Sequence, residues 1–568
     1  MASTYPDEKK INNAQKREYS DDLERTQTVY DDNFHGLSLK TILVYLALCI
    51  AYFVQLFDIV CSGAYARTIA AAVGTSTDSA VWISQVIVIV TATLGPPASQ
   101  AADYWGRKWF FVGSSVFGFV GAIVLARAHS IGQVIAGQTI SSVFFISQPI
   151  LIAVGSEILP RKWRPIAQGG LNAAGGLGGV VAFLGGQSLI DQSPSGWRNI
   201  WYIITALMGA SGIIIATLYW PPPMPLQKTL SASEKFRRLD WVAYFLLAAG
   251  LALLCMGLSW AESPYPWSNA HVVACIVVGG MLILALVVHQ TFFQKHGLLD
   301  HDLFKKDRNF AIAIGCFFLD GMIFWAYNSY FPFEMSTLYA YNSSAIEGAR
   351  NCMNFFATFF AVALIPVISH FTKSIREPTV ISFLAYVVFF ALMAKMDVNE
   401  TGKTWGYPII MGLGLGWSLT YLVAAAQLSA PAHLIAITSG ILLSIRSLGA
   451  SIALGIYNAI FNSELNSKLG SNIAAAVLPL GLPPQSLEAF IGALASEASE
   501  SDIAAIPGVT PQIIGAGVAA LQKAFLNSFK WVYVAAAVIS AVAAIASCFL
   551  INPVKDLNNH VDAPLDED

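Results

Sequence analysis

The stretch Ser99-Gln-Ala-Ala-Asp103-Tyr-Trp-Gly106-Arg107-Lys108 separates two long apolar segments of the chain. Only 12% of the 568 residues are charged and 55% are hydrophobic, so this short run of charges stands out. Gly106 permits a tight turn between two antiparallel helices, and cations beside a membrane helix mark its cytosolic end. The stretch therefore predicts a charged turn at one face of a membrane protein.

Long apolar runs recur along most of the chain, and its mean hydropathy is +0.59. The hydrocarbon core of a bilayer is about 30 Å thick and a helix rises about 1.5 Å per residue. A run of roughly 18 or more apolar residues therefore predicts a membrane-spanning helix. We expect an all-α membrane protein with fourteen such helices, near residues 40–62, 80–98, 109–127, 131–156, 166–190, 198–220, 241–260, 270–292, 309–331, 350–369, 378–396, 405–426, 432–461 and 531–551.

The distribution of Lys and Arg predicts which side of the membrane each loop occupies. An even number of spans puts both termini on one side, and Lys and Arg gather on the cytosolic side. With cytosolic termini, 22 of the 32 cations fall in inner segments and nine in outer ones. Asn342-Ser-Ser and Asn399-Glu-Thr are glycosylation sequons, and both fall in loops that this topology places outside.

The polar segments divide the chain into expected parts. Residues 1–38 carry both charge signs and lack the apolar core of a signal peptide, which predicts a disordered cytosolic tail. The seven cysteines lie in or beside apolar runs, so no disulfide framework is expected. The remaining parts are a six-helix bundle at 39–220, a cytosolic linker at 221–240, two inserted helices at 241–292, a second six-helix bundle at 309–551 with an outer loop at 462–530, and a cytosolic tail at 552–568.

The opening stretch resembles the signature of the major facilitator superfamily, Gly-x-Leu-Ala-Asp-Arg-x-Gly-Arg-Lys, which joins the second and third helices of that family. Ser99 and Tyr104 replace the leading Gly and the first Arg. The resemblance implies the major facilitator fold, with two six-helix bundles around a central cavity. It also implies a cytosolic latch that holds the two halves together in the outward-facing state. The matching latch residues are Asp103, Gly106, Arg107 and Lys108.

Other motifs narrow the resemblance to the 14-helix drug:proton antiporters. Leu239-Asp-Trp241 resembles the start of their two extra helices. Residues 299–305 (LDHDLFK) and 318–326 (FLDGMIFWA) resemble the fungal trichothecene efflux pump group, whose relatives include siderophore–iron transporters. Gln138 stands where the family antiporters carry an Arg in the fourth span, so the proton role of that Arg does not transfer. We retain Gln138 as a candidate for the substrate cavity.

Charged residues within the spans are candidates for function because burying a charge in a bilayer is costly. Asp58 lies late in the first span and Asp320 near the middle of the ninth, which opens the second bundle as the first span opens the first. An apolar wall disfavours the charged form of a carboxylate, so both residues are candidates for proton coupling. Arg446 in the thirteenth span is a candidate for binding an anionic substrate; a buried ion pair or a side chain reaching for the interface is the alternative.

Aromatic residues in the spans can line an apolar binding cavity, although most membrane aromatics serve packing or lie at the interface. The candidates for the cavity are Phe324, Trp325, Tyr327 and Trp417.

Several function classes are disfavoured by what the sequence lacks. There is no Gly-x-x-x-x-Gly-Lys-[Ser/Thr] phosphate loop, which argues against an ATP-driven pump. The nine histidines are scattered, which argues against a polytopic membrane enzyme with a clustered catalytic site. No basic stripe indicates nucleic-acid binding, and we expect no cofactor, no metal and no enzymatic activity.

The sequence therefore predicts a secondary active transporter that works by alternating access. We expect it to export small amphipathic organic compounds, such as toxins or drugs, by proton antiport. Siderophore–iron uptake by proton symport is the alternative, and a polytopic membrane enzyme is a more distant one. The expected partners are the lipid bilayer, a small organic substrate and protons, with the chain acting as a monomer. We expect a multi-pass protein of the plasma membrane, with the vacuolar or another internal membrane as the alternative.

Overall fold

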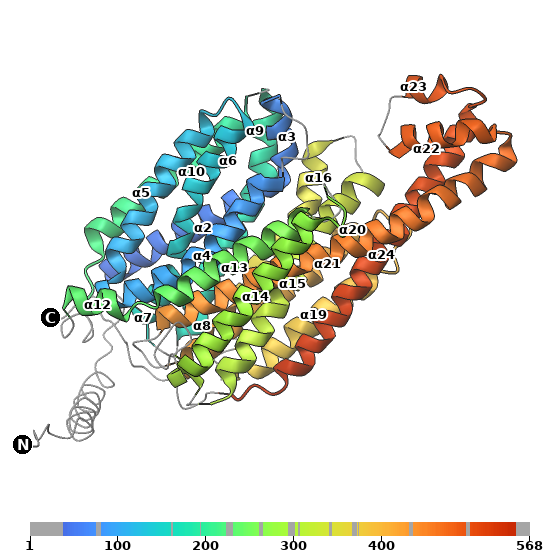
Figure 1. Cartoon of the computed structure of the whole chain (residues 1–568). Coiled ribbons are helices and arrows are strands. Elements are labelled where there is room, and N and C mark those ends of the chain that lie inside the picture. The colour runs from blue at the N-terminus through green and yellow to red at the C-terminus, as the bar shows by residue number, and fades with distance from the viewer. Residues whose placement is uncertain are drawn as a thin grey trace, which may run out of the picture.

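The computed structural model describes residues 38–74, 81–160, 163–193, 195–222, 231–260, 265–293, 301–304, 307–339, 343–365, 368, 372, 374–430, 435–495 and 500–552. Within these ranges, 13 helices are long and apolar enough to cross a membrane. Figure 1 shows most of them lying side by side along a common direction. The all-α membrane fold expected from the sequence is therefore confirmed.

The first bundle follows the expected order of six spans. Two of its spans change helix type along their length. The fourth span contains a short 3-10 segment at Val143–Ile146, and the fifth contains a π-helical turn at Ala182–Gly186. The elements are α2 (Leu39–Ala64), α3 (Ala66–Ala72), α4 (Val81–Trp105), α5 (Arg107–Ala126), α6 (Ile131–Ser142), η2 (Val143–Ile146), α7 (Ser147–Glu157), α8 (Arg164–Val181), η4 (Ala182–Gly186), α9 (Gln187–Gln192) and α10 (Trp197–Leu218).

A short helix, α12 (Ala232–Arg238), precedes the inserted pair, and a Ser231–Glu234 capping box starts it. The inserted pair is α13 (Trp241–Trp260) and α14 (Ala270–Val288), with η5 (His289–Phe293) extending α14. The second bundle and its connections are η6 (His301–Phe304), α15 (Asn309–Leu338), α16 (Ser344–Asn351), α17 (Met353–Ala363), α19 (Arg376–Met393), α20 (Lys403–Ser429), α21 (Ile435–Val477), η8 (Leu478–Leu480), η9 (Pro484–Ser486), α22 (Leu487–Ala495), α23 (Glu500–Ala504) and α24 (Pro511–Ser547).

Two expected boundaries need comment. The tenth expected span, 350–369, corresponds to the end of α16 and to α17, and its last part lies partly outside the described residues. The second span was expected to end at residue 98, but α4 continues through Pro96 and Pro97 to Trp105. The turn between α4 and α5 therefore consists of Gly106 alone, and the charged residues on either side of it belong to the two helices. Only glycine readily adopts the φ of 97° found at Gly106.

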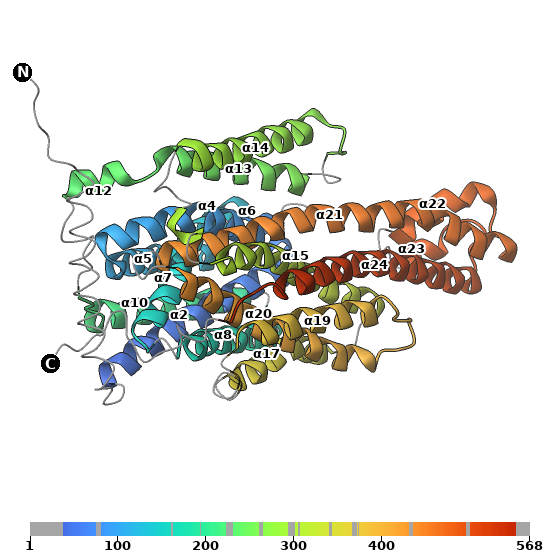
Figure 2. The same ribbon diagram turned by 90° about the horizontal axis from the view of Figure 1, so that it is seen from below.

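The segment 462–530, predicted to be an outer loop with short helices near the outer surface, is largely helical in its described residues. α21 has 43 residues and α24 has 37, so each is far longer than a bilayer needs. Their extensions diverge from the other helices and carry α22 and α23 at the tip (Figures 1 and 2). A separate apolar cluster holds this tip together, and its buried members include Ile473, Val477, Phe490, Leu494 and Ile513. In the sequence, the apolar residues of this cluster are interspersed with alanines and polar residues, so no continuous apolar run marks them.

The two bundles contact each other through equivalent helices. The second helix of the first bundle, α4, packs on the fifth of the second, α21; α8 and α17 form the reciprocal pair. Of the inserted pair, α13 packs against α4 and α21 from one side (Figure 2), and there Cys255 Sγ lies 3.0 Å from Ser451 Oγ. α14 remains largely exposed, as expected for a helix that faces lipid.

We call the end of the molecule that carries Gly106 and α12 the inner face, and we expect it to be cytosolic. The outer face is the opposite end, which carries α22 and α23 (Figure 1).

Small residues allow close helix contacts in a membrane, where apolar side chains gain little from leaving lipid. In the first bundle, α5 and α6 approach at Gly121, where a Cβ would overlap the backbone of Ser141. Gly113 lies on the same helix with nothing within 4 Å of its Cβ direction.

We therefore predict that Gly121→Val lowers the stability of the protein, because overpacking typically costs about 1–3 kcal/mol. Gly113→Val provides the matched control, and it should unfold like the wild type. The measurement is the melting temperature of each purified variant in detergent. Equal melting temperatures for the two variants would contradict the described α5–α6 contact.

Candidate functional site

Asp58 and Gln138 form a buried polar site within the first bundle. Asp58 on α2 is fully buried and accepts hydrogen bonds from Ser62 Oγ at 3.0 Å and from Gln138 Nε2 on α6 at 3.2 Å. All of these donors are neutral, and no described cation forms an ion pair with Asp58. The residue that replaces the family's arginine thus becomes the partner of this carboxylate, 80 positions away in the chain.

Asp320 and Arg446 form a second site, in the second bundle. Arg446 Nε on α21 lies 2.8 Å from Asp320 Oδ2 on α15, and the carboxylate is fully buried. Its other oxygen accepts hydrogen bonds from Ser418 Oγ at 2.8 Å and from the Tyr386 hydroxyl at 3.1 Å. Four helices of the second bundle therefore meet at one carboxylate.

Close packing of α15 and α21 makes the ion pair possible. A Cβ at Gly321, beside Asp320, would overlap the carbonyl oxygen of Arg446, and a Cβ at Gly449 would overlap that of Phe318. Each helix thus presents a glycine to the backbone of the other. The side chain of Arg446 keeps 20% of its surface exposed, and its Nη2 has no hydrogen-bond partner among the described residues.

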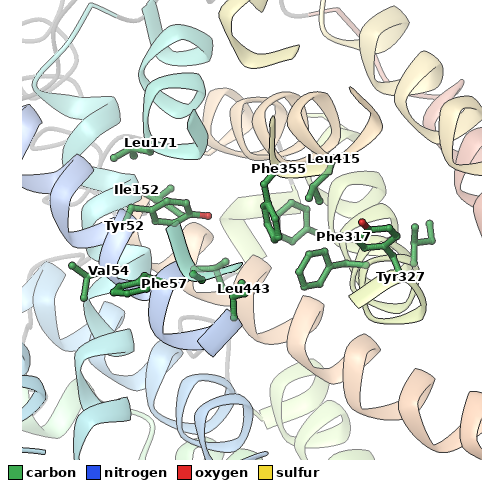
Figure 3. Close-up of a cluster of buried hydrophobic side chains, with 14 of the residues drawn as sticks. Tyr52, Val54, Phe57, Ile152, Leu171, Phe317, Tyr327, Phe355, Leu415 and Leu443 are labelled. Atoms are coloured by element: carbon green, nitrogen blue, oxygen red, sulfur yellow. The ribbon is translucent and has the colours of Figure 1, made fainter. Parts of the chain in front are cut away.

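The Asp320–Arg446 pair faces the junction of the two bundles. Tyr52 on α2, in the first bundle, lies within electrostatic reach of both groups. Its hydroxyl donates to Asn172 Oδ1 at 3.3 Å, and Asn172 Nδ2 donates to Thr420 Oγ1 of the second bundle at 3.0 Å. Figure 3 shows the hydroxyl of Tyr52 pointing toward side chains of the second bundle.

The four aromatic candidates occupy different environments. Phe324 lies beneath Arg446, with the guanidinium carbon 4.8 Å from the ring centroid, and Trp325 packs edge-on against Phe324. Tyr327 stacks on Phe331 within the core of the second bundle, away from Arg446. Trp417 donates its indole N–H to the carbonyl of Ala361 at 2.9 Å. The structure therefore joins only Phe324 and Trp325 to the Arg446 site.

The four predicted latch residues lie close together at the inner face, but their contacts differ. Arg107 lies between Asp103, at 2.9 Å, and Glu157, with which it also forms an ion pair. Asp103 Oδ2 accepts the backbone N–H of Ile437 from the second bundle at 3.3 Å. Lys108 remains outside this network and packs over the ring of Trp220.

A second set of polar contacts joins the two bundles near the same face. Ser156 Oγ lies 2.6 Å from Gln427 Oε1, and Arg164 donates to the carbonyl of Gln427 at 3.3 Å. Gln427 in turn donates to Ser439 Oγ at 2.9 Å. The inner side of the molecule is therefore closed by hydrogen bonds between the halves.

Comparisons with known proteins agree with this architecture. The family model of the Major Facilitator Superfamily matches residues 48–454. The chain belongs to the Major Facilitator Superfamily. It is 24% identical to the MFS-type transporter prx5 of Penicillium rubens, over 77% of this chain and 79% of that protein. It is 21% identical to the trichothecene efflux pump TRI12 of Fusarium sporotrichioides, over 81% of this chain and 78% of that one.

Solved structures share the fold of this facilitator at low identity. An auto-inhibited peptide transporter of the POT family superposes with a TM-score of 0.56 and 13% identity, covering 93% of this chain and 99% of that one. Together with the apolar helices, these findings establish a multi-pass membrane transporter. The family expected from the sequence is confirmed.

Sequence reasoning missed one fully buried carboxylate of this facilitator, Glu334. Glu334 on α15 is fully buried and accepts a hydrogen bond from the Tyr533 hydroxyl on α24 at 2.6 Å. Arg350 is one of the nine cations that the predicted topology places in outer segments. It is also fully buried and donates to the carbonyl of Tyr339 at 2.8 Å. The ninth span was predicted to end at residue 331, but α15 continues to Leu338. Apolar and aromatic residues after position 331 are the signal that could have extended the predicted span to include Glu334.

The two sequons fall outside these sites. Asn342 lies outside the described residues. Asn399 is exposed in the connection between α19 and α20, so the position is accessible for glycosylation.

We predict that Arg446→Ala destabilises the facilitator strongly, because it leaves the buried Asp320 carboxylate without its cation. Breaking a buried ion pair typically costs about 3–5 kcal/mol. The double variant Asp320→Asn/Arg446→Ala should recover much of the loss. Arg376→Ala is the control, because Arg376 forms an exposed pair with Glu377 and such pairs contribute about 0–1 kcal/mol. The readout is the melting temperature; a double variant no more stable than Arg446→Ala would refute this role of the pair.

We also predict that Asp103→Asn weakens the closure of the inner face. The substitution removes a charged acceptor from Arg107 and Ile437, and hydrogen bonds to charged groups contribute about 1.5–3 kcal/mol. Spin labels at Trp109 and Phe549, both exposed near the inner face, would report the separation of the halves in a background without the native cysteines. The distance distribution should shift toward longer values. Asp191→Asn, at an exposed position on α9, should leave it unchanged.

Proposed function

We propose that this protein is a proton-driven antiporter that exports small amphipathic organic compounds by alternating access. The observation that carries the proposal is the buried Asp320–Arg446 ion pair, which faces the junction of the two bundles. The names of the relatives, among them an efflux pump, support export as the direction.

A proton and a substrate can compete at this pair. In its charged form, Asp320 accepts hydrogen bonds from Arg446, Ser418 and Tyr386. Protonation neutralises the carboxylate and removes its attraction for Arg446, which then becomes available to a polar group of the substrate. Departure of the substrate returns Arg446 to the carboxylate and favours loss of the proton. This exchange is the coupling that an antiporter requires.

Asp58 is the second candidate for carrying a proton. A buried carboxylate with neutral partners alone has no counter-ion to offset the loss of hydration, so a proton is its simplest compensation. Gln138 can adapt to either form, since its amide group both donates and accepts hydrogen bonds. Asp58 lies on the first helix of the first bundle and Asp320 on the first helix of the second. Two candidate proton sites on equivalent helices suit alternating access.

The surroundings of Arg446 favour an amphipathic substrate. Phe324 and Trp325 offer aromatic faces beside a single cation. Around the junction, the apolar side chains of Ile152 and Leu443 and the ring of Tyr52 lie opposite Phe355 and Leu415 (Figure 3), so the junction offers apolar contacts as well. A compound with an apolar body and one polar group matches this chemistry.

Alternating access requires a seal that can open. The contacts of Asp103 with Ile437 and of Ser156 with Gln427 cross between the bundles at the inner face. We propose that these contacts form the latch and that they separate when the cavity opens toward the cytosol. We further propose that the protein acts as a monomer in the plasma membrane.

Siderophore–iron uptake by proton symport is the second candidate function. The observation in its favour is Arg446 Nη2, a buried donor without a partner among the described residues, which an anionic chelate could engage. The aromatic rings of Phe324 and Trp325 beside Arg446 suit a compound with an apolar body better than a polar chelate, and this favours export.

Transport into inside-out vesicles separates the two functions. With an acidic lumen, an antiporter accumulates a labelled trichothecene in the lumen, whereas a symporter releases a preloaded ferric siderophore from it. We expect accumulation of the trichothecene, abolished by a protonophore. Asp58→Asn and Asp320→Asn should each reduce it at least tenfold, while Asp191→Asn transports normally. Proton-driven transport that survives both substitutions would refute the assignment of the coupling residues, and release of the siderophore alone would favour symport.

A further inference from the structure

A cavity of about 990 Å³ opens on the side of the second bundle, between the outer end of α19 and the extended parts of α21 and α24. Its lining includes none of the residues of the two buried carboxylate sites or of the latch. Figure 2 shows α24 running beside α19 and continuing past it together with α21. The cavity is therefore separate from the proposed transport site.

The part of the cavity farther from the inner face is strongly basic. Four lysines from three segments line it: Lys395, Lys468, Lys523 and Lys530. Lys468 pairs with Glu464 at 2.6 Å, and Asp397 also lines the cavity. The other three lysines form no ion pair with a described residue. Positive charge thus exceeds negative charge here, on the face of the protein expected to carry only nine of the 32 cations.

The other part of the cavity is apolar and formed by small side chains. Val534, Ala537, Val538 and Ala541 lie on one face of α24, and the cavity is also lined by Ala391 of α19 and by Ala394, the residue directly after α19. Apart from Ala394, these residues lie within candidate membrane spans. The small alanine side chains leave room along the helices for a narrow apolar chain.

The basic and apolar parts meet near the expected membrane surface. From Trp531 to the end of α24 at Ser547 the helix rises about 25 Å, close to the thickness of the hydrocarbon core. Lys530 therefore lies where α24 leaves the hydrocarbon, and Lys395 lies two residues beyond the last residue of α19 and lines the same cavity. Lysine side chains at such positions extend toward the headgroups.

We propose that this cavity binds a membrane phospholipid with a net negative headgroup. The phosphate lies among Lys395, Lys523 and Lys530, and one acyl chain follows the apolar wall of α24. The excess of positive charge favours an anionic headgroup over a zwitterionic one, because the amine of the latter is repelled by the same lysines. The bound lipid joins α19 to α24 where the long extension of α24 leaves the bundle.

The test measures retention of lipid by the purified full-length protein in detergent, using native mass spectrometry. Phosphatidylglycerol should bind at least tenfold more tightly than phosphatidylcholine with matched chains. Lys523→Gln/Lys530→Gln should reduce binding of phosphatidylglycerol at least tenfold. Arg127→Gln/Lys403→Gln removes two exposed cations outside the cavity lining and should bind like the wild type. Melting temperatures without added lipid check that both variants are folded.

Two further arms distinguish a phospholipid from a free anion. Ala537→Leu/Ala541→Leu fills the apolar part and should weaken phosphatidylglycerol binding at least tenfold. Inorganic phosphate at millimolar concentration should not displace the lipid from the wild type. Equal binding of the two lipids, unchanged binding by the lysine variant, or displacement by phosphate with no effect of the leucines would each overturn the proposal. None of these outcomes depends on transport, so the proposed antiport is tested separately.

Discussion

A side chain buried in a membrane-spanning bundle has no water to replace its hydration, so each charge must be compensated inside the protein. The structure meets this constraint differently at its two central carboxylates. Asp320 is neutralised by Arg446, whereas Asp58 has only neutral donors. Proton exchange and ion pairing are thus the two available forms of compensation. In the antiport mechanism that we propose, protonation of Asp320 alternates with its ion pair to Arg446.

The same constraint governs the inner face. Two cations begin α5, where the positive end of the helix dipole disfavours them. Arg107 is offset by Asp103 and Glu157, and Lys108 by the ring of Trp220. Asp103 has a free oxygen left for the backbone of the opposite bundle. The charge compensation of one helix terminus therefore also connects the two halves.

Glycine decides where such contacts can form. The Asp320–Arg446 pair lies where Gly321 brings α15 and α21 into backbone contact, and a longer separation would leave the buried Asp320 carboxylate without its counter-ion. Close packing in the second bundle and its polar chemistry thus depend on the same positions. The inserted helix α13 packs against α4 and α21 and so covers one side of this junction.

The sequence alone determined the class of fold, the order of the spans and the main buried charges, because hydrophobic length and the cost of charge in a bilayer are local properties. Asp58, Asp320 and Arg446 were identified as candidates in this way. Partners were decided only by the tertiary structure: nothing in the sequence joins Gln138 to Asp58, since 80 residues separate them. The extension of α21 and α24 beyond the membrane also emerged only in three dimensions, because helices outside a bilayer are stabilised by what they pack against rather than by their own hydropathy.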